Sequence, residues 1–243
     1  MEQFAPYLPS ILHGLVTTVC VSVLSILGCA AVSVVFGVLR AVPQPAVQRL
    51  ALLAVELMRG ASAVIYLFWV YYALAAIPGA PQLTPFTASV LVLSIIGGAY
   101  GAEIVRGAIQ AVPASQRDAC RALGLSPANA TARVVLPQAL SQIVPAFSSL
   151  AADLVKWTSI VSFVGVEDVF YAANTARTGT NETVLVFVLL AVLYLALSVC
   201  VTAFFRGIEY LLPMNRANRR SRSRTAGRAA EPAVELPVSA VAR

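Results

Sequence analysis

Three pairs of opposite charge stand at helical spacing in or beside apolar stretches of the chain. The two members of each pair are three positions apart, so their side chains can meet on one face of a helix. The pairs are Glu56 with Arg59, Glu103 with Arg106, and Asp153 with Lys156. A charge at the centre of a membrane span costs about 2.5 to 3.5 kcal/mol on insertion scales, so charges that remain there pair, line a cavity or lie at an edge. These residues therefore indicate ion pairing or the lining of a cavity, and not the breaking of covalent bonds.

The first two pairs and the third pair are expected to differ in role. Glu56–Arg59 and Glu103–Arg106 lie near the ends of apolar segments, where a neutralised pair steadies helix packing. Asp153 and Lys156 instead follow a long apolar stretch, so they either line a polar route for a small zwitterion or form a buried ion pair. The candidates for lining such a route are Tyr66, Tyr71, Asp153, Lys156, Thr158 and Ser159.

The residues that enzymatic chemistry needs are not present in a usable pattern. A phosphate-binding loop requires a glycine-rich run ending in Gly-Lys and Ser or Thr, but the only lysine, Lys156, lies between Val155 and Trp157. The single histidine, His13, argues against a Ser-His triad and against a histidine metal site. The four cysteines show no metal-ligand spacing. We expect no enzymatic activity, no bound metal and no cofactor in this chain.

The composition places these residues in a membrane. The chain has 243 residues, of which 59% are hydrophobic and 12% charged, and its mean hydropathy is +0.81. No charged residue occurs between Arg59 and Glu103, a window long enough for two crossings of about 20 residues each, separated by turn residues from Pro78 to Pro85. Further apolar runs cover about 11–39, 139–163 and 183–205. The sequence predicts an all-α polytopic membrane protein with about five transmembrane helices.

The arginines predict the orientation of these helices. Arginine and lysine are retained on the cytoplasmic side during insertion. They gather in the first loop, the third loop and the region after the last helix: Arg40, Arg49, Arg106, Arg117, Arg121, Arg133 and Arg206. Only Arg177 lies in an even-numbered loop. We therefore expect the N-terminus outside and the C-terminus in the cytoplasm.

The last thirty residues form a segment of a different kind. Residues 214–243 contain seven arginines and two glutamates, a net charge of +5 out of +6 for the whole chain. We expect residues 1–213 to be the transmembrane domain, and residues 214–243 to be a disordered cytoplasmic tail that fixes topology and can touch anionic membrane lipid. This interpretation is preferred over binding to nucleic acid.

A polar and basic segment at residues 118–137 separates two apolar segments and predicts a helix-turn-helix elbow. It begins with an acidic residue and two small ones, Asp118, Ala119 and Cys120, which start the first helix, and Gly124 can adopt the positive φ that ends that helix. Ser126 suits an N-cap and Pro127 the first position of a second short helix, whose continuation Pro137 should limit. The apolar close of the segment is Val134, Leu136 and Pro137.

This spacing is similar to the EAA loop of permease subunits in ABC importers. The loop of that family has an acidic residue, two small ones, glycine after three more residues, and an aliphatic-x-Leu-Pro close. The resemblance implies a cytoplasmic coupling loop, about 106–140, that docks into a cleft of an ATP-hydrolysing subunit. The residues that would carry this role are Asp118, Ala119, Cys120, Gly124, Val134, Leu136 and Pro137. Asp118 stands for the customary glutamate and Cys120 for the second alanine.

Other stretches resemble the polar amino-acid branch of these importers. They are Gly14 with Thr17 and Thr18, ELMRG at 56–60, AEIVRGAIQAVP at 102–113, KWTSI at 156–160 and RGIEYLLP at 206–213. Departures occur at Ala61, Ser62, Tyr66 and Trp157, and the RGASA stretch also resembles permeases for compatible solutes such as ectoine. The resemblance implies a bacterial cell-membrane permease with three protein partners: a separate ABC subunit that binds ATP and magnesium, a second permease subunit, identical or different, and an extracytoplasmic solute-binding protein.

Three other classes of protein compete with this interpretation. A self-contained secondary transporter or channel would need no ATPase, but the chain shows no internal duplication. A membrane-embedded enzyme would need a cluster of catalytic side chains, which the sequence lacks. A simple anchor would not need charges inside its spans. The secondary transporter is the principal alternative.

Overall fold

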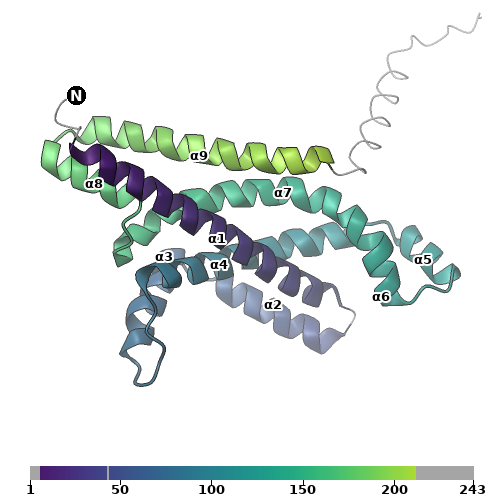
Figure 1. Ribbon diagram of the computed structural model, residues 1–243. Helices are drawn as coiled ribbons and strands as arrows, with labels where there is room; N and C mark the ends of the chain where they lie inside the picture. Colours follow the sequence, from purple (N-terminus) through teal and green to yellow (C-terminus); the bar gives the residue numbers. More distant parts are fainter. Residues whose placement is uncertain (1–5, 43, 212–243) are drawn as a thin grey trace, which may run out of the picture.

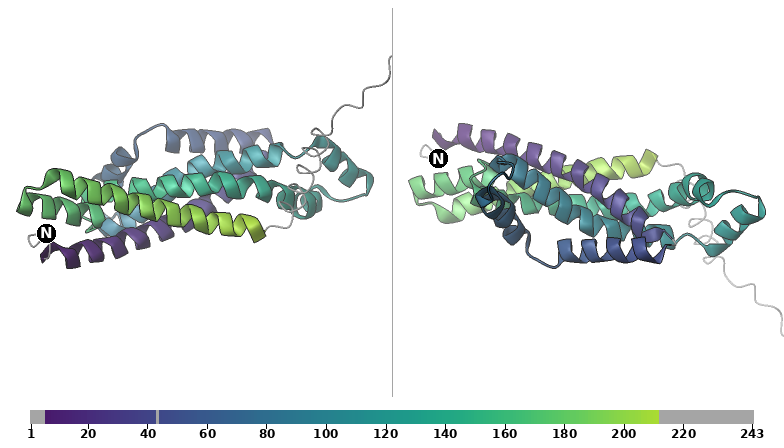
Figure 2. Two further views of the ribbon diagram at one scale, coloured as in Figure 1. Left: turned by 90° about the horizontal axis from the view of Figure 1, so that it is seen from above. Right: turned by 90° about the horizontal axis from the view of Figure 1, so that it is seen from below.

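The computed structural model describes residues 6–42 and 44–211, except the side chains of residues 127 and 128, and these residues form helices joined by short turns. The basic tail predicted at 214–243 lies outside them. Four helical segments are long and apolar enough to cross a membrane. They are α1 (Leu8–Ala41), α4 (Pro85–Gln110), Thr131–Val164, which contains α7 (Leu136–Trp157), and α9 (Thr183–Leu211). The long helices run side by side along one direction (Figures 1 and 2).

The central pair of the bundle is α1 with α4, and small residues allow the two helices to approach closely. The Ser33 hydroxyl of α1 donates to the Gly98 carbonyl of α4 at 3.3 Å. A Cβ at Gly101 would overlap the Ser33 side chain and lie 3.1 Å from the Phe147 ring. Small residues at helix contacts in a membrane bring backbones together, where dispersion and weak polar contacts hold them. This contact places the C-terminal halves of α1 and α4 next to each other.

The second expected span is not one straight helix. α2 (Pro45–Arg59) ends where the Gly60 N–H donates to the Leu57 carbonyl, and the backbone is extended at Ser62 before α3 (Ala63–Phe68) begins. A π turn (Trp69–Ala73) and a 3-10 turn (Leu74–Ala76) continue α3. The two halves meet at 93°, and the second half turns away from the bundle axis (Figure 1). The described residues therefore give four straight spans, or five if the bent pair is one broken span.

Two different structures cap the two ends of the bundle. α8 (Val169–Thr180) lies beside the first turns of α1 and α9 at one end, and α5 (Ala114–Ala122) with α6 (Pro127–Ala130) projects at the other (Figures 1 and 2). α8 follows a 3-10 turn (Thr158–Val164) and Gly165, which has a φ of 89°. Most of α9 is exposed, with large apolar side chains facing outward, as expected of a helix in contact with lipid or with another membrane subunit.

Candidate functional site

The elbow at residues 118–137 contains the predicted turn. Gly124 has a φ of 72°, its N–H donates to the Arg121 carbonyl at 2.9 Å, and the Leu125 N–H donates to the Cys120 carbonyl at 3.0 Å. This pair of bonds is a Schellman motif, which satisfies carbonyls left free at a helix end and needs a left-handed residue. The predicted positive φ of Gly124 is confirmed.

The first helix of the elbow begins earlier than expected. α5 starts at Ala114, directly after Pro113, so Asp118 and Ala119 lie inside the helix and not at its start. The side chains of Asp118 and Ala119 are exposed, and Asp118 pairs with Arg121 at 3.5 Å. Cys120 faces inward and is buried. Asp118 and Ala119 thus form an outward surface, to which Cys120 does not contribute.

The second helix of the elbow starts as predicted and continues further than predicted. The Ser126 hydroxyl accepts the Asn129 N–H at 3.4 Å, which is the N-cap bond. Instead of ending near Pro137, the helix passes through a π turn (Thr131–Val135) into α7. Proline lacks an N–H and its ring crowds the carbonyl four residues earlier, and the wider π turn gives the helix a place to absorb that disruption. The expectation that Pro137 limits the second helix is therefore wrong.

The elbow is joined to the bundle by an apolar contact that the sequence did not single out. Val135 and Ala139 are buried against Val105, Ile109 and Val112 at the end of α4. Of the apolar residues of the predicted motif, Val134 is partly buried and Leu136 is exposed. The inward position of Val135 could have been found only by knowing the helical phase across the π turn.

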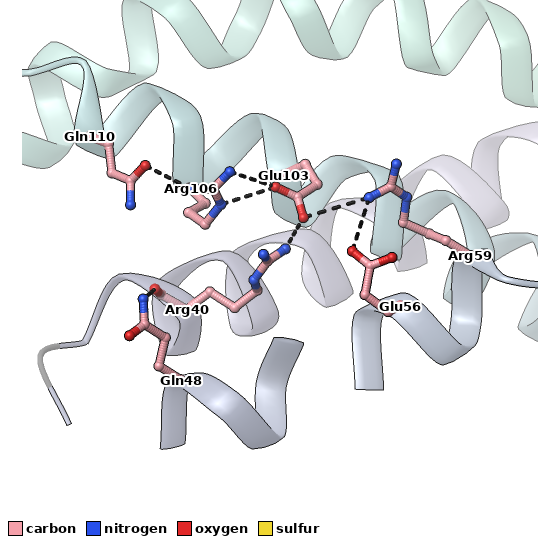
Figure 3. A network of polar contacts seen from close by, with 7 residues as sticks. All are labelled: Arg40, Gln48, Glu56, Arg59, Glu103, Arg106 and Gln110. Carbon is pink, nitrogen blue, oxygen red and sulfur yellow. Dashed lines mark hydrogen bonds and ion pairs between the residues drawn. The ribbon is translucent and has the colours of Figure 1, made fainter. Parts of the chain in front are cut away.

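The first two charge pairs meet in one cluster around Glu103, shown in Figure 3 and called the Glu103 network below. The predicted partners lie close together, with Glu56 at 3.6 Å from Arg59 and Glu103 at 3.0 Å from Arg106. Glu103 also pairs with Arg59 at 3.6 Å and with Arg40 of α1. One carboxylate therefore binds three guanidinium groups and joins α1, α2 and α4.

Arg40 is the member of this network that the sequence did not assign. Its side chain is 9% exposed and pairs with a residue 63 positions away, so no local spacing could reveal it. Arg59 has a further contact, because its guanidinium lies 4.9 Å from the centre of the Tyr100 ring. The network lies at the last two turns of α4, directly before the chain enters α5.

Lys156 of the third charge pair lines a groove between α7 and α9, called the α7–α9 groove below. Lys156 donates to Asp153 at 2.8 Å, and both side chains are about half exposed. Within this chain the pair is therefore not the buried ion pair that the sequence left open as the alternative to a polar route. The groove has a volume of about 560 Å³, and its polar lining residues are Lys156, Tyr194, Ser198, Thr202 and Arg206.

Four of these lining residues follow a pattern that sequence reading could have detected. Tyr194, Ser198, Thr202 and Arg206 occur at every fourth position of α9, so they form one polar stripe along an otherwise apolar helix. A polar stripe in a membrane helix is expected to face protein or a wet cavity and not lipid. The stripe therefore marks the face of α9 that lines the α7–α9 groove.

The other candidates for a polar route lie apart from this groove. The Tyr66 hydroxyl donates to the Leu57 carbonyl across the bend, and Tyr71 packs in the π turn against the core. Thr158 is fully buried and donates to the Val155 carbonyl at 2.8 Å, while Ser159 donates to the Lys156 carbonyl at 2.9 Å. None of these four lines the α7–α9 groove, so the structure groups Lys156 with residues of α9 instead. Within the described residues, no three His, Cys, Asp or Glu side chains form a group that could hold a metal ion.

The helices and sites described above define a multi-pass membrane protein, and comparisons with known proteins give its family. Residues 33–210 match the family model of the binding-protein-dependent transport system inner membrane component. The chain is 36% identical over 218 residues to a probable amino-acid ABC transporter permease protein, y4tF, of Sinorhizobium fredii, covering 88% of this chain and 92% of the relative. It is 30% identical over 224 residues to the L-cystine transport system permease protein TcyL of Bacillus subtilis, with the same two coverages.

Solved structures have the same architecture. An amino acid ABC transporter crystallised with histidines superposes with a TM-score of 0.77 at 26% identity, covering 86% of this chain and 97% of the other. A chain of the MetNI methionine ABC transporter, with a TM-score of 0.70 at 23% identity, shares the fold. The chain belongs to the binding-protein-dependent transport system inner membrane component family. The resemblance to permease subunits of ABC importers, and the all-helical membrane fold, are confirmed.

Proposed function

We propose that this chain is the translocating subunit of an ATP-driven importer for polar amino acids or related small zwitterionic solutes. The observation that carries the proposal is the elbow: an exposed helix-turn-helix with a Gly124 Schellman turn, joined without a loop to α7. ATP and magnesium would bind a separate ABC subunit, and the elbow would dock on that subunit. The amino-acid solute is supported by two relatives, a probable amino-acid permease and an L-cystine permease.

The proposed arrangement places the elbow and the C-terminus in the cytoplasm and the N-terminus outside. It is supported by the arginines of the first and third loops, since basic residues favour the cytoplasmic side. α8 then lies at the outer face, toward an extracytoplasmic solute-binding protein. The exposed apolar surface of α9 would contact lipid or a second permease subunit in a bacterial cell membrane.

The α7–α9 groove is the proposed solute route within this subunit. Lys156 is positioned to bind a carboxylate, and Asp153, 2.8 Å from it, is positioned to bind an ammonium group. A zwitterion carries both groups, so it can replace the internal ion pair with two equivalent ones. Ectoine, a compatible solute with the same two charges, is the comparison ligand for tests of specificity.

Substitutions at Gly124 test the coupling. A β-branched residue is strained at a φ of 72°, whereas asparagine tolerates the left-handed region. In proteoliposomes with the ABC subunit and binding protein, Gly124→Val should lose at least about tenfold in ATP-driven uptake, and Gly124→Asn should retain most of it. Equal uptake by both variants would contradict the turn argument, and wild-type uptake without nucleotide would favour a secondary transporter.

Lys156→Ala tests the route in the same vesicles. The variant should reduce uptake while it preserves assembly with the ABC subunit and ATP hydrolysis, because Lys156 is half exposed and distant from the elbow. Its removal should change stability by no more than about 1 kcal/mol. Normal uptake by Lys156→Ala would remove this residue from the solute route.

A further inference from the structure

α8 is held to two long helices by a small buried cluster, called the Asp168 junction below. It consists of Gly14 and Thr18 of α1, Asp168 and Val169 at the start of α8, and Tyr194 of α9. Thr18, Asp168 and Val169 are fully buried. No residue of this junction belongs to the elbow or to the charge pairs described above.

Asp168 uses its two carboxylate oxygens for two different elements. One oxygen accepts the Tyr171 N–H at 2.8 Å and caps α8. The other oxygen accepts the Tyr194 hydroxyl of α9 at 3.3 Å. A hydrogen bond to a charged group is stronger than one between neutral groups, so Asp168 fixes the start of α8 and the Tyr194 hydroxyl at the same time.

A second set of bonds ties the same helix start to α1. The Thr18 hydroxyl accepts the Val169 N–H at 3.0 Å and donates to the Gly14 carbonyl at 2.9 Å. A Cβ on Gly14 would lie 2.6 Å from the Asp168 carbonyl oxygen, so only glycine permits this approach. This contact with α1 does not involve the residues that line the α7–α9 groove.

Tyr194 connects the junction to the groove. Its side chain lines the α7–α9 groove together with Lys156 and Ser198, while its hydroxyl reaches Asp168. Tyr194 thus lines the groove and also binds, through its hydroxyl, the Asp168 carboxylate that caps α8. A movement of α8 that carries Asp168 must either pull the Tyr194 ring or break this bond.

We propose that Asp168 is a positioning residue for transport: by binding the Tyr194 hydroxyl, it makes the outer helix α8 and the wall of the α7–α9 groove move together. The inference rests on the proposed function for its direction, because α8 is an outer element only in the proposed orientation. It assigns Asp168 and Tyr194, which bind each other, a role that neither the elbow nor the ion pairs supply.

The test uses the complete transporter in proteoliposomes, with Cys20, Cys29, Cys120 and Cys200 replaced and a single reporter, Ser198→Cys, placed in the groove. A membrane-impermeant maleimide added from outside measures how often the groove opens to that side. Tyr194→Phe removes only the hydroxyl, so the cap on α8 stays. It should raise the labelling rate and the KM for solute, each by about threefold to tenfold, the range expected for loss of one such hydrogen bond.

The matched control is Thr18→Val, which removes the α1 contact to the same helix start and leaves the groove unchanged. It should lower Tm without changing the labelling rate or the KM. If Tyr194→Phe behaves like Thr18→Val, the junction only supports the fold and the proposal is overturned. Asp168→Asn keeps an oxygen for the cap and replaces the acceptor that faces Tyr194, so it should shift labelling in the same direction and decides the matter if Tyr194→Phe does not assemble.

The labelling readout needs no cargo, so the two proposals can fail separately. Increased labelling in Tyr194→Phe with no amino-acid uptake by the wild-type transporter would reject the proposed solute and retain the α8 coupling. Unchanged labelling in Tyr194→Phe with normal uptake by the wild-type transporter would reject the α8 coupling and retain the proposed solute.

Discussion

Two carboxylates hold together the opposite ends of the bundle, and they do so by different chemistry. Glu103, near the elbow, is surrounded by three arginines and remains about one quarter exposed. Asp168, at the α8 end, is fully buried and binds an N–H and a hydroxyl. Charge is balanced by charge where water can still reach the site, and by neutral donors where it cannot. The two ends should therefore respond differently to mutation and to pH.

The largest expected effect follows from removing the charge of Glu103. Glu103→Gln leaves Arg40, Arg59 and Arg106 beside one another, with only Glu56 to balance them. Breaking a buried pair costs about 3 to 5 kcal/mol, and the partial exposure of Glu103 places the loss near the lower limit. The midpoint of thermal unfolding in detergent, measured at one fixed scan rate, should fall markedly.

The control for this variant is Glu56→Gln, at an exposed carboxylate that contacts only Arg59 of the network, at 3.6 Å. Its effect should stay within about 1 kcal/mol. Similar losses in the two variants would show that the network acts as a diffuse cluster and that Glu103 is not its centre.

A smaller effect is expected at the opposite end from Gly14→Ala. The added Cβ would lie 2.6 Å from the Asp168 carbonyl oxygen, and overpacking of this kind costs about 1 to 3 kcal/mol. Gly107→Ala is the matched control, because nothing lies within 4 Å of a Cβ there and alanine favours a helix by about 0.5 to 1 kcal/mol over glycine. The two substitutions should change Tm in opposite directions, and a shared sign would contradict the close approach.

The last expected effect separates the two ends by pH. Asp168 lies between the third and fourth straight spans, and burial raises its pKa from 3.8 to about 6, against the opposing effect of its hydrogen bonds. The folded chain then binds a proton that the unfolded chain has lost, so this contribution to stability is fully present below pH 4 and is lost as pH rises through about 6. It amounts to about 1.4 kcal/mol for each pH unit within that window.

Tm measured from pH 4 to pH 7 should show this decline in the wild type and a smaller one in Asp168→Asn, which cannot titrate at that position. The same difference should persist in a Glu56→Gln background, since Glu56 lies at the other end. A decline of equal size in Asp168→Asn would assign the titration to another group.

The sequence was sufficient for the features that depend on local pattern. Hydropathy located the long spans, Gly124 and Ser126 located the elbow turn, and three-residue spacing located the charge pairs. The turn and the charge pairs come from residues within about one helical turn of each other, where side chains meet whatever the rest of the fold does. The spans come from continuous apolar runs of about 20 residues.

Features that depend on contacts between distant segments were missed. Arg40 meets Glu103 across two helices. Asp168 meets Tyr194, and its neighbour Val169 meets Thr18, only because α1, α8 and α9 converge. The 93° bend after Gly60 occurs at the start of the charge-free window, in which hydropathy indicated two crossings but no bend. The π turn before Pro137 could not be anticipated because proline is more often a helix boundary than an interior residue.

The π turn has a consequence for how force travels through the molecule. Since helical hydrogen bonding continues from Pro127 to Trp157, no loop separates the tip of the elbow from Lys156, and at 1.5 Å per residue the two are joined by a strut roughly 45 Å long. Tilting one end of such a strut displaces the other end. Within the strut, the π turn and Pro145 are positions where the regular helix is interrupted and can bend.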